Sequence, residues 1–533
     1  MALALLVPAI CLHKAIDHDE IAHVHSAWMV SRGLIPDVDF QARHHPLYYQ
    51  GTAWLCGLID DPGRLLVAHR ALMALNLGLL VCLVVEAGRR LWDLRAGLAA
   101  GYFLLTSGIL TVGAMEVRPD APQATLSFLA LLLLLPRPGQ ARTGSRIGMF
   151  LLSGAVSGVA LCVLQKALAP LAAMAPALLW ASLGEGVPAE KIGAQRLLPV
   201  RIAAFAAAAS LPCVLLLVPI LSRGFDNYLL YCWRFNASYV AHRPFDPELW
   251  LACWRHAPGL WVLAVLGIIR AARTTPMLVA VTVPAALGLL MSVVVQAPYK
   301  QYLFWIWPIL ALAAAAGHRL AGDWFSRRLP LGRPAYSALL VAVTLACPGM
   351  LLYRVAHEGP VFERYAGYMR FLERNIPPAE RVFDDDHQLN VRRLDTSFNW
   401  FGRPEDFADL SEAAGRDMFP DRVAELKRWR PRIVVLTLRY PAPVHEFFQQ
   451  RYVPGPMTCV FLAGAIATAD ADGRAQLPVW IAARYDALTS SRRSRPRLAG
   501  RVFRAAGETL ATGVTVLEGL QPSESVGLRL HVE

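Results

Sequence analysis

The chain has 533 residues, of which 55% are hydrophobic, with a formal net charge of +12 and a mean hydropathy of +0.39. Soluble globular chains are usually about 45–50% apolar. The excess lies in residues 1–353, whereas 354–533 has an ordinary soluble composition, so the whole chain is not a soluble globular protein. No basic run is interleaved with aromatic residues, which argues against nucleic-acid binding.

Long apolar runs predict a polytopic α-helical membrane protein with about 11 transmembrane helices. The expected spans are 1–16, 65–86, 96–114, 121–136, 147–165, 168–183, 202–222, 258–270, 276–295, 302–318 and 335–353. Every second loop is rich in arginine, and the positive-inside rule places those loops in the cytoplasm. The N-terminus is then cytoplasmic, and the odd number of spans puts the chain after 353 outside the membrane.

Two domains follow from this layout. Residues 1–353 form the membrane domain, and 354–533 form an extracytoplasmic α/β domain with a β-rich tail from about 495. The first outer loop, 17–64, has the pattern of two interfacial helices. A second outer segment, 223–257, is rich in Tyr and Trp, as expected at a membrane surface. It also holds Cys232 and Cys253, which allows a disulfide in an oxidising compartment.

Asp19 and Glu20 directly follow the first apolar run, in "AIDHDEIAH". Adjacent carboxylates on a helix point about 100° apart, so one can face a cavity while the other contacts a neighbour. Charge beside a membrane is costly unless it is solvated or functional. The alternative is a helix start, where negative charge is favoured by the helix dipole.

The outer connection "EVRPD" places Glu116, Arg118 and Asp120 at one membrane edge. Arg118 precedes a proline and is therefore held extended, which makes a rigid turn. The alternative is a solvated turn with an internal ion pair. Three charges exceed what a short turn requires, so we expect a functional site here.

Lys166 and Lys300 are two of only five lysines in the chain, and each ends a span on the outer side. A compact ammonium group suits a phosphate, and with Arg118 these lysines are placed to hold the phosphate of a lipid carrier. The alternative is that both lysines snorkel to the membrane surface.

His44 and His45 lie in "ARHHPLYY", in the same outer loop as three further histidines. Together with Asp19 they suggest a metal site, but no HExxH-like ligand pair is present. Hydrogen-bonding surface histidines are the alternative. No cofactor is required, and a divalent metal stays unsupported.

These motifs, in this order, resemble those of GT-C glycosyltransferases that use dolichyl- or polyprenyl-phosphate sugars, such as protein O-mannosyltransferases and lipid A aminoarabinose transferases. The resemblance covers about the first 320 residues. Its carriers are "DE" (19–20), "GLIPDVDFQARHHPLYY" (33–49), "RPD" (118–120) and "YKQY" (299–302). It implies a GT-C membrane fold in the inner (plasma) membrane of a bacterium.

The resemblance also implies roles for single residues. Asp19 would be the catalytic base or a carboxylate that positions the acceptor, with Glu20 beside it, and Asp120 the second catalytic carboxylate. Donor phosphate would be bound by Arg118, Lys166 and Lys300, the two lysines by position only. Some relatives have Lys-Pro where this chain has His45-Pro46. The remaining pocket residues would be Glu116, His44, His45, Tyr299 and Tyr302.

The expected reaction moves a sugar from a polyprenyl-phosphate donor to a lipid, glycan or protein acceptor at the outer face, with inversion. The rival function is a transporter or flippase for a lipid-linked or acidic solute. The charges cluster at one face rather than at the midplane, and no inverted repeat is visible, which disfavours transport. An inactive assembly protein is a third alternative.

Overall fold

The computed structural model describes residues 14 and 16–135, 147–183, 198–241, 247–273, 278–294, 299–328, most of 334–344, and parts of 361–532. Its contacts divide the chain into two units, Met1–Ala366 and Gly367–Glu533. The boundary expected from composition lies at 353/354. The roles expected of the two parts stay predictions.

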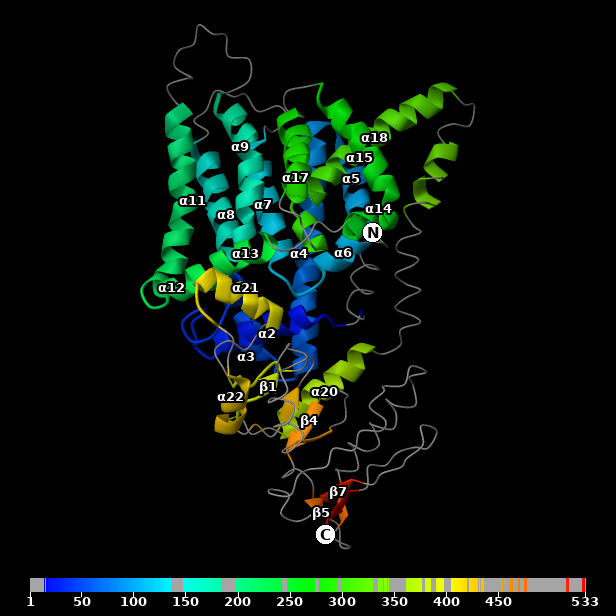
Figure 1. The fold of residues 1–533 in the computed structure, drawn as a ribbon. Coiled ribbons are helices and arrows are strands. Elements are labelled where there is room, and N and C mark those ends of the chain that lie inside the picture. The colour runs from blue at the N-terminus through cyan, green and yellow to red at the C-terminus, as the bar shows by residue number, and fades with distance from the viewer. Residues whose placement is uncertain are drawn as a thin grey trace. The chain divides into compact units, whose positions relative to one another are not determined.

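The first unit is a bundle of helices (Figure 1). Helices α7, α8, α9 and α11 pack on one another, as do α4, α5, α15 and α18. The helices are α2 (His18–Ser31), α3 (Leu47–Leu58), α4 (Pro62–Leu91), α5 (Leu94–Leu105), α6 (Ile109–Ala114), α7 (Asp120–Leu134), α8 (Ile147–Val163), α9 (Leu168–Leu183), α11 (Leu198–Leu221), α12 (Phe225–Tyr228), α13 (Phe235–Ala241), α14 (Pro247–His256), α15 (Pro258–Ala271), α17 (Val283–Val294) and α18 (Trp307–Arg328). Four short segments of other helical type join them: η1 (Gln165–Ala167), η2 (Leu229–Arg234), η3 (Leu278–Thr282) and η4 (Lys300–Leu303).

By length and apolar composition, two described helices can cross a membrane, Pro62–Leu91 and Leu198–Leu216. A third is added if α14 and α15, which meet at a bend of 96°, form one broken span. Several other apolar helices are shorter. The count of about 11 spans stays a prediction, and the first expected span, 1–16, lies almost entirely outside the described residues.

The expected span 96–114 is wrong as one continuous helix. The structure has two helices there, α5 and α6, separated at Thr106–Gly108. Gly108 has φ +58°, a left-handed backbone that ends the regular helix and that glycine adopts readily. The break turns the short helix α6 toward the connection that carries Glu116 and Arg118.

Glycines let neighbouring helices approach at van der Waals distance. A Cβ built on Gly158 of α8 would lie 2.1 Å from the Ala209 carbonyl oxygen of α11, and one on Gly154 would lie 2.2 Å from that of Phe205. These two glycines are four residues apart, the small-xxx-small spacing of membrane helix pairs. Gly267 of α15 makes an equally close approach to Ala313 of α18. The bundle is thus held by backbone-to-backbone packing.

The first outer loop folds into α2 and α3, as its pattern predicts. A capping box starts α2: Asp17 accepts from the Asp19 backbone N–H, and the Glu20 carboxylate accepts from the Asp17 backbone N–H at 3.1 Å. Helix α2 packs on α3, and both helices contact α4. The helix-start alternative for this stretch is therefore correct for Asp17 and Glu20. It does not account for the side chain of Asp19.

The second unit is α/β. Its helices are α21 (Pro404–Ala414) and α22 (Arg422–Trp429), while α20 (Val361–Asn375) spans the boundary. One sheet has the order β1-β2-β4-β3, with β1 (Phe383–Asp384) parallel to β2 (Ile433–Val435), and β4 (Val460–Ala463) antiparallel to β2 and β3 (Tyr452–Pro454). A second, antiparallel sheet has the order β5-β6-β8-β7 and contains β5 (Thr468–Ala469), β6 (Arg474–Gln476), β7 (Val514–Val516) and β8 (Leu530–Val532).

Candidate active site

Charged side chains from four separate parts of the first unit meet in one place, which we call the ionic cluster. Three contributors come from the start of the described chain, and the others come from the α6–α7 connection with the first residue of α7, from η1 and from η4. The cluster comprises four cations and four carboxylates: Lys14, Arg118, Lys166 and Lys300 with Asp17, Asp19, Glu116 and Asp120. Sequence analysis expected six of these eight; Lys14 and Asp17 are additions.

Arg118 is the centre of the cluster. Its guanidinium binds Asp19 and contacts Asp17 at 3.1 Å, while its Nε donates to Glu116 Oε2 at 3.1 Å. Burial opposes the charge, but the surrounding carboxylates, Asp19 first, outweigh it and raise the pKa of Arg118 well above its usual range. Arg118 is therefore a permanent cation that fixes the direction of the Asp19 carboxylate.

Glu116 is the most enclosed carboxylate of the cluster, with a side chain 1% exposed. Lys300 donates to its Oε1 at 2.6 Å, and Lys14 donates to the same oxygen. Burial raises the pKa of Glu116, but Lys14, Lys300 and Arg118 more than compensate and lower it to about 2. The alternative for "EVRPD" is wrong in expecting a solvated turn, because Glu116, Arg118 and Asp120 are all buried, whereas its internal ion pair is present between Arg118 and Glu116.

Asp120 begins α7 and pairs with Lys166 at 2.9 Å. The Lys166 ammonium also lies 4.0 Å from the centre of the Tyr302 ring, a cation–π contact. Burial lowers the pKa of Lys166, but Asp120 and Tyr302 reverse that effect and raise it. Lys166 and Lys300 therefore do not simply snorkel to solvent, since each holds a buried carboxylate.

Glu20 is buried in an ion pair with Arg70 of α4, at 2.6 Å and 2.9 Å. Its carboxylate also accepts from the Val117 backbone N–H at 3.1 Å, which ties α2 to the "EVRPD" connection. Burial raises the pKa of Glu20, but Arg70 and Lys14 outweigh it, and the net shift is downward. Sequence analysis missed Arg70, although a lone arginine inside the apolar run 65–86 is an unusual signal.

Two histidines of the first outer loop, His23 and His44, form an uncharged aromatic wall beside Asp19 together with Tyr48 and Tyr49. His23, one turn after Asp19 on α2, contacts the rings of His44, Tyr48 and Tyr49 at centroid distances of 5.5–5.9 Å. Burial lowers the pKa of His23 to about 4 and that of His44 well below its usual range. Both rings are therefore neutral near pH 7.

His45 lies apart from this wall. Its Nε2 is hydrogen-bonded to the Tyr228 hydroxyl at 3.1 Å, so it joins the first outer loop to the aromatic segment 223–257. Among the described residues, no group of three or more His, Cys, Asp or Glu side chains is placed to hold a metal ion. The metal site considered for His44 and His45 thus gains no supporting geometry.

Of the two tyrosines expected in the pocket, Tyr302 contacts Lys166, whereas Tyr299 is 40% exposed and lies near Tyr302 with ring centroids 6.5 Å apart.

The disulfide considered for Cys232 and Cys253 is wrong, because both thiols are free and buried. Cys232 instead donates to the Asp37 carboxylate at 3.3 Å. Burial raises the pKa of Asp37 to about 8, so this loop contact lies between two uncharged groups near neutral pH.

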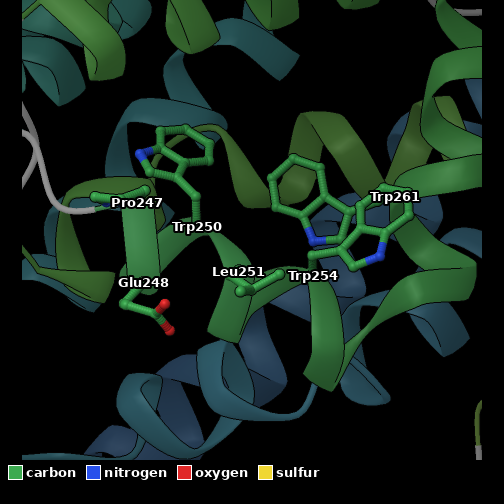
Figure 2. Close-up of a pocket in the computed structure, with 6 residues that line it drawn as sticks. All are labelled: Pro247, Glu248, Trp250, Leu251, Trp254 and Trp261. Carbon is green, nitrogen blue, oxygen red and sulfur yellow. The ribbon is translucent and has the colours of Figure 1, made fainter.

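An apolar pocket of about 450 Å³ lies on α14 and the start of α15. Figure 2 shows Trp254 and Trp261 together on one side, Trp250 on the other, and the Glu248 carboxylate pointing away from all three. Helix α14 packs against α6, and α6 in turn contacts η4, which carries Lys300. The pocket is therefore on a helix that borders the ionic cluster.

This helical bundle, with its charged residues gathered in connections between helices, has a fold known from solved structures. The fold is shared with ArnT from Cupriavidus metallidurans. ArnT bound to undecaprenyl phosphate has a TM-score of 0.54 at 17% identity, covering 81% of this chain and 91% of that chain. The apo state has a TM-score of 0.57 at 16% identity, covering 87% and 96%.

At these identities the similarity is one of fold, and it agrees with the fold that the resemblance implies. A looser similarity extends to the oligosaccharyltransferase AglB from Archaeoglobus fulgidus in complex with an inhibitory peptide and a dolichol-phosphate, with a TM-score of 0.48 at 12% identity over 81% of this chain and 69% of that chain. No protein-family model and no curated protein sequence matches the chain.

Proposed function

We propose that this chain is a membrane glycosyltransferase that moves a sugar from a polyprenyl-phosphate donor to an acceptor at the outer face of the membrane. The observation that carries the proposal is the ionic cluster. It combines a partly exposed carboxylate, Asp19, with three cations in expected outer connections, Arg118, Lys166 and Lys300, and with Lys14 near the outer end of the first expected span. A base next to an anion-binding group is what transfer from a phosphate-linked sugar requires.

Asp19 is the proposed base because substrate can reach it. Its side chain is 26% exposed, whereas Glu116 and Glu20 are 1% and 0% exposed and Asp120 is 5% exposed. Asp17 is equally accessible, but it caps α2 and is held by that role. Glu20 and Asp120 then position Arg70 and Lys166 rather than react, a narrower role than the catalytic one expected from the resemblance.

The reaction is a single displacement. Asp19 takes the proton of the acceptor hydroxyl or amine as the acceptor atom bonds to the anomeric carbon. The bond from that carbon to the phosphate oxygen breaks, and its electron pair stays on the phosphate. Arg118, Lys166 and Lys300, with Lys14 as an addition, stabilise the developing charge. Attack opposite the leaving phosphate inverts the anomeric configuration.

The neutral wall beside Asp19 is the proposed surface for the sugar. His23 and His44 carry no charge near pH 7, and Tyr48 and Tyr49 add aromatic faces. Aromatic rings and neutral hydrogen-bonding groups suit a polar ring with apolar faces. The wall therefore holds the sugar without competing for the phosphate.

The tryptophan pocket is the proposed site for the first isoprene units of the donor. Its walls are apolar, its helix packs on α6, and α6 contacts η4, which carries Lys300. A donor whose phosphate is held by Lys300 would thus have a hydrocarbon surface beside it. The acceptor, which can be a lipid, a glycan or a protein, is left open.

The test is a transfer assay with the purified chain in proteoliposomes. Polyprenyl-phosphate sugars carrying different radiolabelled sugars are compared with the matching nucleotide sugars, with membrane extract as acceptor. We expect label transfer from at least one lipid donor and from none of the nucleotide sugars. Movement of the lipid donor across the bilayer without any transfer would instead favour the transporter.

A further inference from the structure

Glu116 is surrounded by more positive charge than it can neutralise. Lys14 and Lys300 share its Oε1, and Arg118 donates to its Oε2. The carboxylate is fixed in place, since its side chain is 1% exposed and the next residue, Val117, is anchored through its backbone N–H to Glu20. The two lysine side chains are 15% and 22% exposed, so they have room to turn toward a second anion.

The proposed reaction changes the charge of the phosphate group held by these cations. A donor sugar phosphate is a diester with one negative charge. After transfer the lipid ends in a phosphate monoester. The second pKa of this phosphate is about 6, so its charge at pH 7 is about −1.5 to −2. Cations that bind the donor phosphate therefore bind the product phosphate more strongly. Slow release of the product then limits turnover.

We propose that Glu116 is an internal competitor that takes Lys14 and Lys300 back from the product phosphate and so sets the rate of product release. This inference rests on the proposed function. Glu116 fits this role better than the other carboxylates because two flexible ammonium groups meet at one of its oxygens. Among the described residues, Asp120 has Lys166 within hydrogen-bond distance, and Asp19 and Asp17 both contact Arg118. Glu116 is a positioning residue, since it acts through the two lysines.

The structure also limits where Lys300 can go. A Cβ on Gly113 of α6 would lie 3.1 Å from Lys300 Cε, so the lysine stem lies against that helix. The ammonium group can therefore change partner by rotation at its end, without movement of η4. Exchange between Glu116 and a phosphate then requires no change of fold.

The first test compares wild type with Glu116→Gln in nanodiscs. We expect the variant to bind a polyprenyl phosphate monoester about tenfold more tightly at pH 7.5. For a non-transferable polyprenyl phosphodiester the gain should be smaller. The excess gain for the monoester should shrink at pH 5.5, where this phosphate has lost its second charge. Equal affinity of both proteins for the monoester would overturn the inference.

Kinetics separate release from a general structural effect. In Glu116→Gln the single-turnover rate should not fall, because the freed lysines also stabilise the charge that develops during transfer, while steady-state kcat and KM both fall and product inhibition strengthens. A single-turnover rate that falls as much as kcat would mean that Glu116 supports chemistry, which contradicts the inference. Glu86→Gln is the matched control, because Glu86 also pairs with two cations, Arg89 and Arg90, far along α4 from the cluster. Glu86→Gln should leave the single-turnover rate and the steady-state kcat unchanged.

A second variant protects the test if Glu116→Gln does not fold. Lys14→Gln removes one of the exchanging cations, so we expect weaker binding of the monoester and a smaller difference between monoester and diester. An unchanged difference would contradict the inference. If wild type binds neither lipid phosphate, the proposed function itself fails. If wild type binds both lipids and transfers sugar, but Glu116→Gln matches it, only the role of Glu116 is wrong.

Discussion

Glu20 and Asp19 show how adjacent residues on one helix separate into different roles. Both were expected near the chemistry, and the 100° step between them turns one side chain inward and leaves the other accessible. Glu20 is buried against Arg70, whereas Asp19 is partly exposed beside Arg118. The sequence predicts the step, but only the fold supplies Arg70 as the partner. The same holds for Lys14, whose contact with Glu116 joins positions 102 residues apart.

The buried pair predicts a large and partner-dependent loss of stability. Arg70→Met leaves the Glu20 charge buried without its main partner, and we expect a loss of about 3–5 kcal/mol. The double variant Glu20→Leu/Arg70→Met removes both charges and should be more stable than Arg70→Met. Thermal unfolding in detergent compares wild type, Arg70→Met and the double variant. A double variant that is less stable than Arg70→Met would contradict this account.

Burial of His23 predicts a pH dependence of stability. Its pKa falls from 6.5 in the unfolded chain to about 4 in the folded one. Between these values the unfolded chain binds the proton and the folded chain does not, so stability is complete above about pH 6.5 and falls as the pH drops toward 4. His23→Gln should show a smaller fall in melting temperature between pH 7.5 and 5 than wild type. An identical fall in both proteins would show that His23 is accessible to protons in the folded state.

At the scale of elements, hydropathy predicted approximate helix positions in the described part of the chain. It did not predict the break between α5 and α6 or the close contact between α8 and α11. The residues "TSGIL" contained the signal for the break before α6, a glycine after a serine, within an otherwise apolar run. The contact of α8 with α11 depends on which helix meets which. Gly154 and Gly158 show the spacing in sequence, and the fold shows the partner. Periodicity alone could not identify α11 as that partner.

Close helix packing predicts that Gly158→Ile destabilises the protein. The added side chain would meet the Ala209 carbonyl of α11, and overpacking of this kind costs about 1–3 kcal/mol or more. Gly148→Ile is the matched control on the same helix, because nothing lies within 4 Å of a Cβ there. Melting temperatures in detergent compare the two variants. Equal melting temperatures would show that α8 and α11 are not packed as described.

The tryptophan pocket predicts a dependence on lipid chain length. Trp254 is 44% exposed, so Trp254→Ala should preserve the fold while removing one pocket wall. We expect a higher KM for a long-chain donor and little change for a donor with one or two isoprene units. Initial rates with a chain-length series measure this. The same rise in KM for every chain length would place the lipid elsewhere.

At the scale of the whole molecule, the fold could be predicted because motifs and apolar runs follow one another in the order that the resemblance to GT-C glycosyltransferases implies. The fold similarity to ArnT, at 16% identity over 87% of this chain, bears out that prediction. The orientation of the two units across a membrane depends on the bilayer, and the arginine distribution remains its only support. The sugar and the acceptor depend on contacts that residue types alone do not encode.

The most direct test of the account is Asp19→Asn, measured as sugar transfer from a polyprenyl-phosphate donor in proteoliposomes. Asp93→Asn, an exposed carboxylate that caps α5, is the control. The account predicts that Asp19→Asn inserts and binds polyprenyl phosphate like wild type, while kcat falls about 10²-fold or more because the acceptor proton has no base. A variant that transfers sugar at the wild-type rate would contradict the account, and Asp19 would then be only a partner of Arg118.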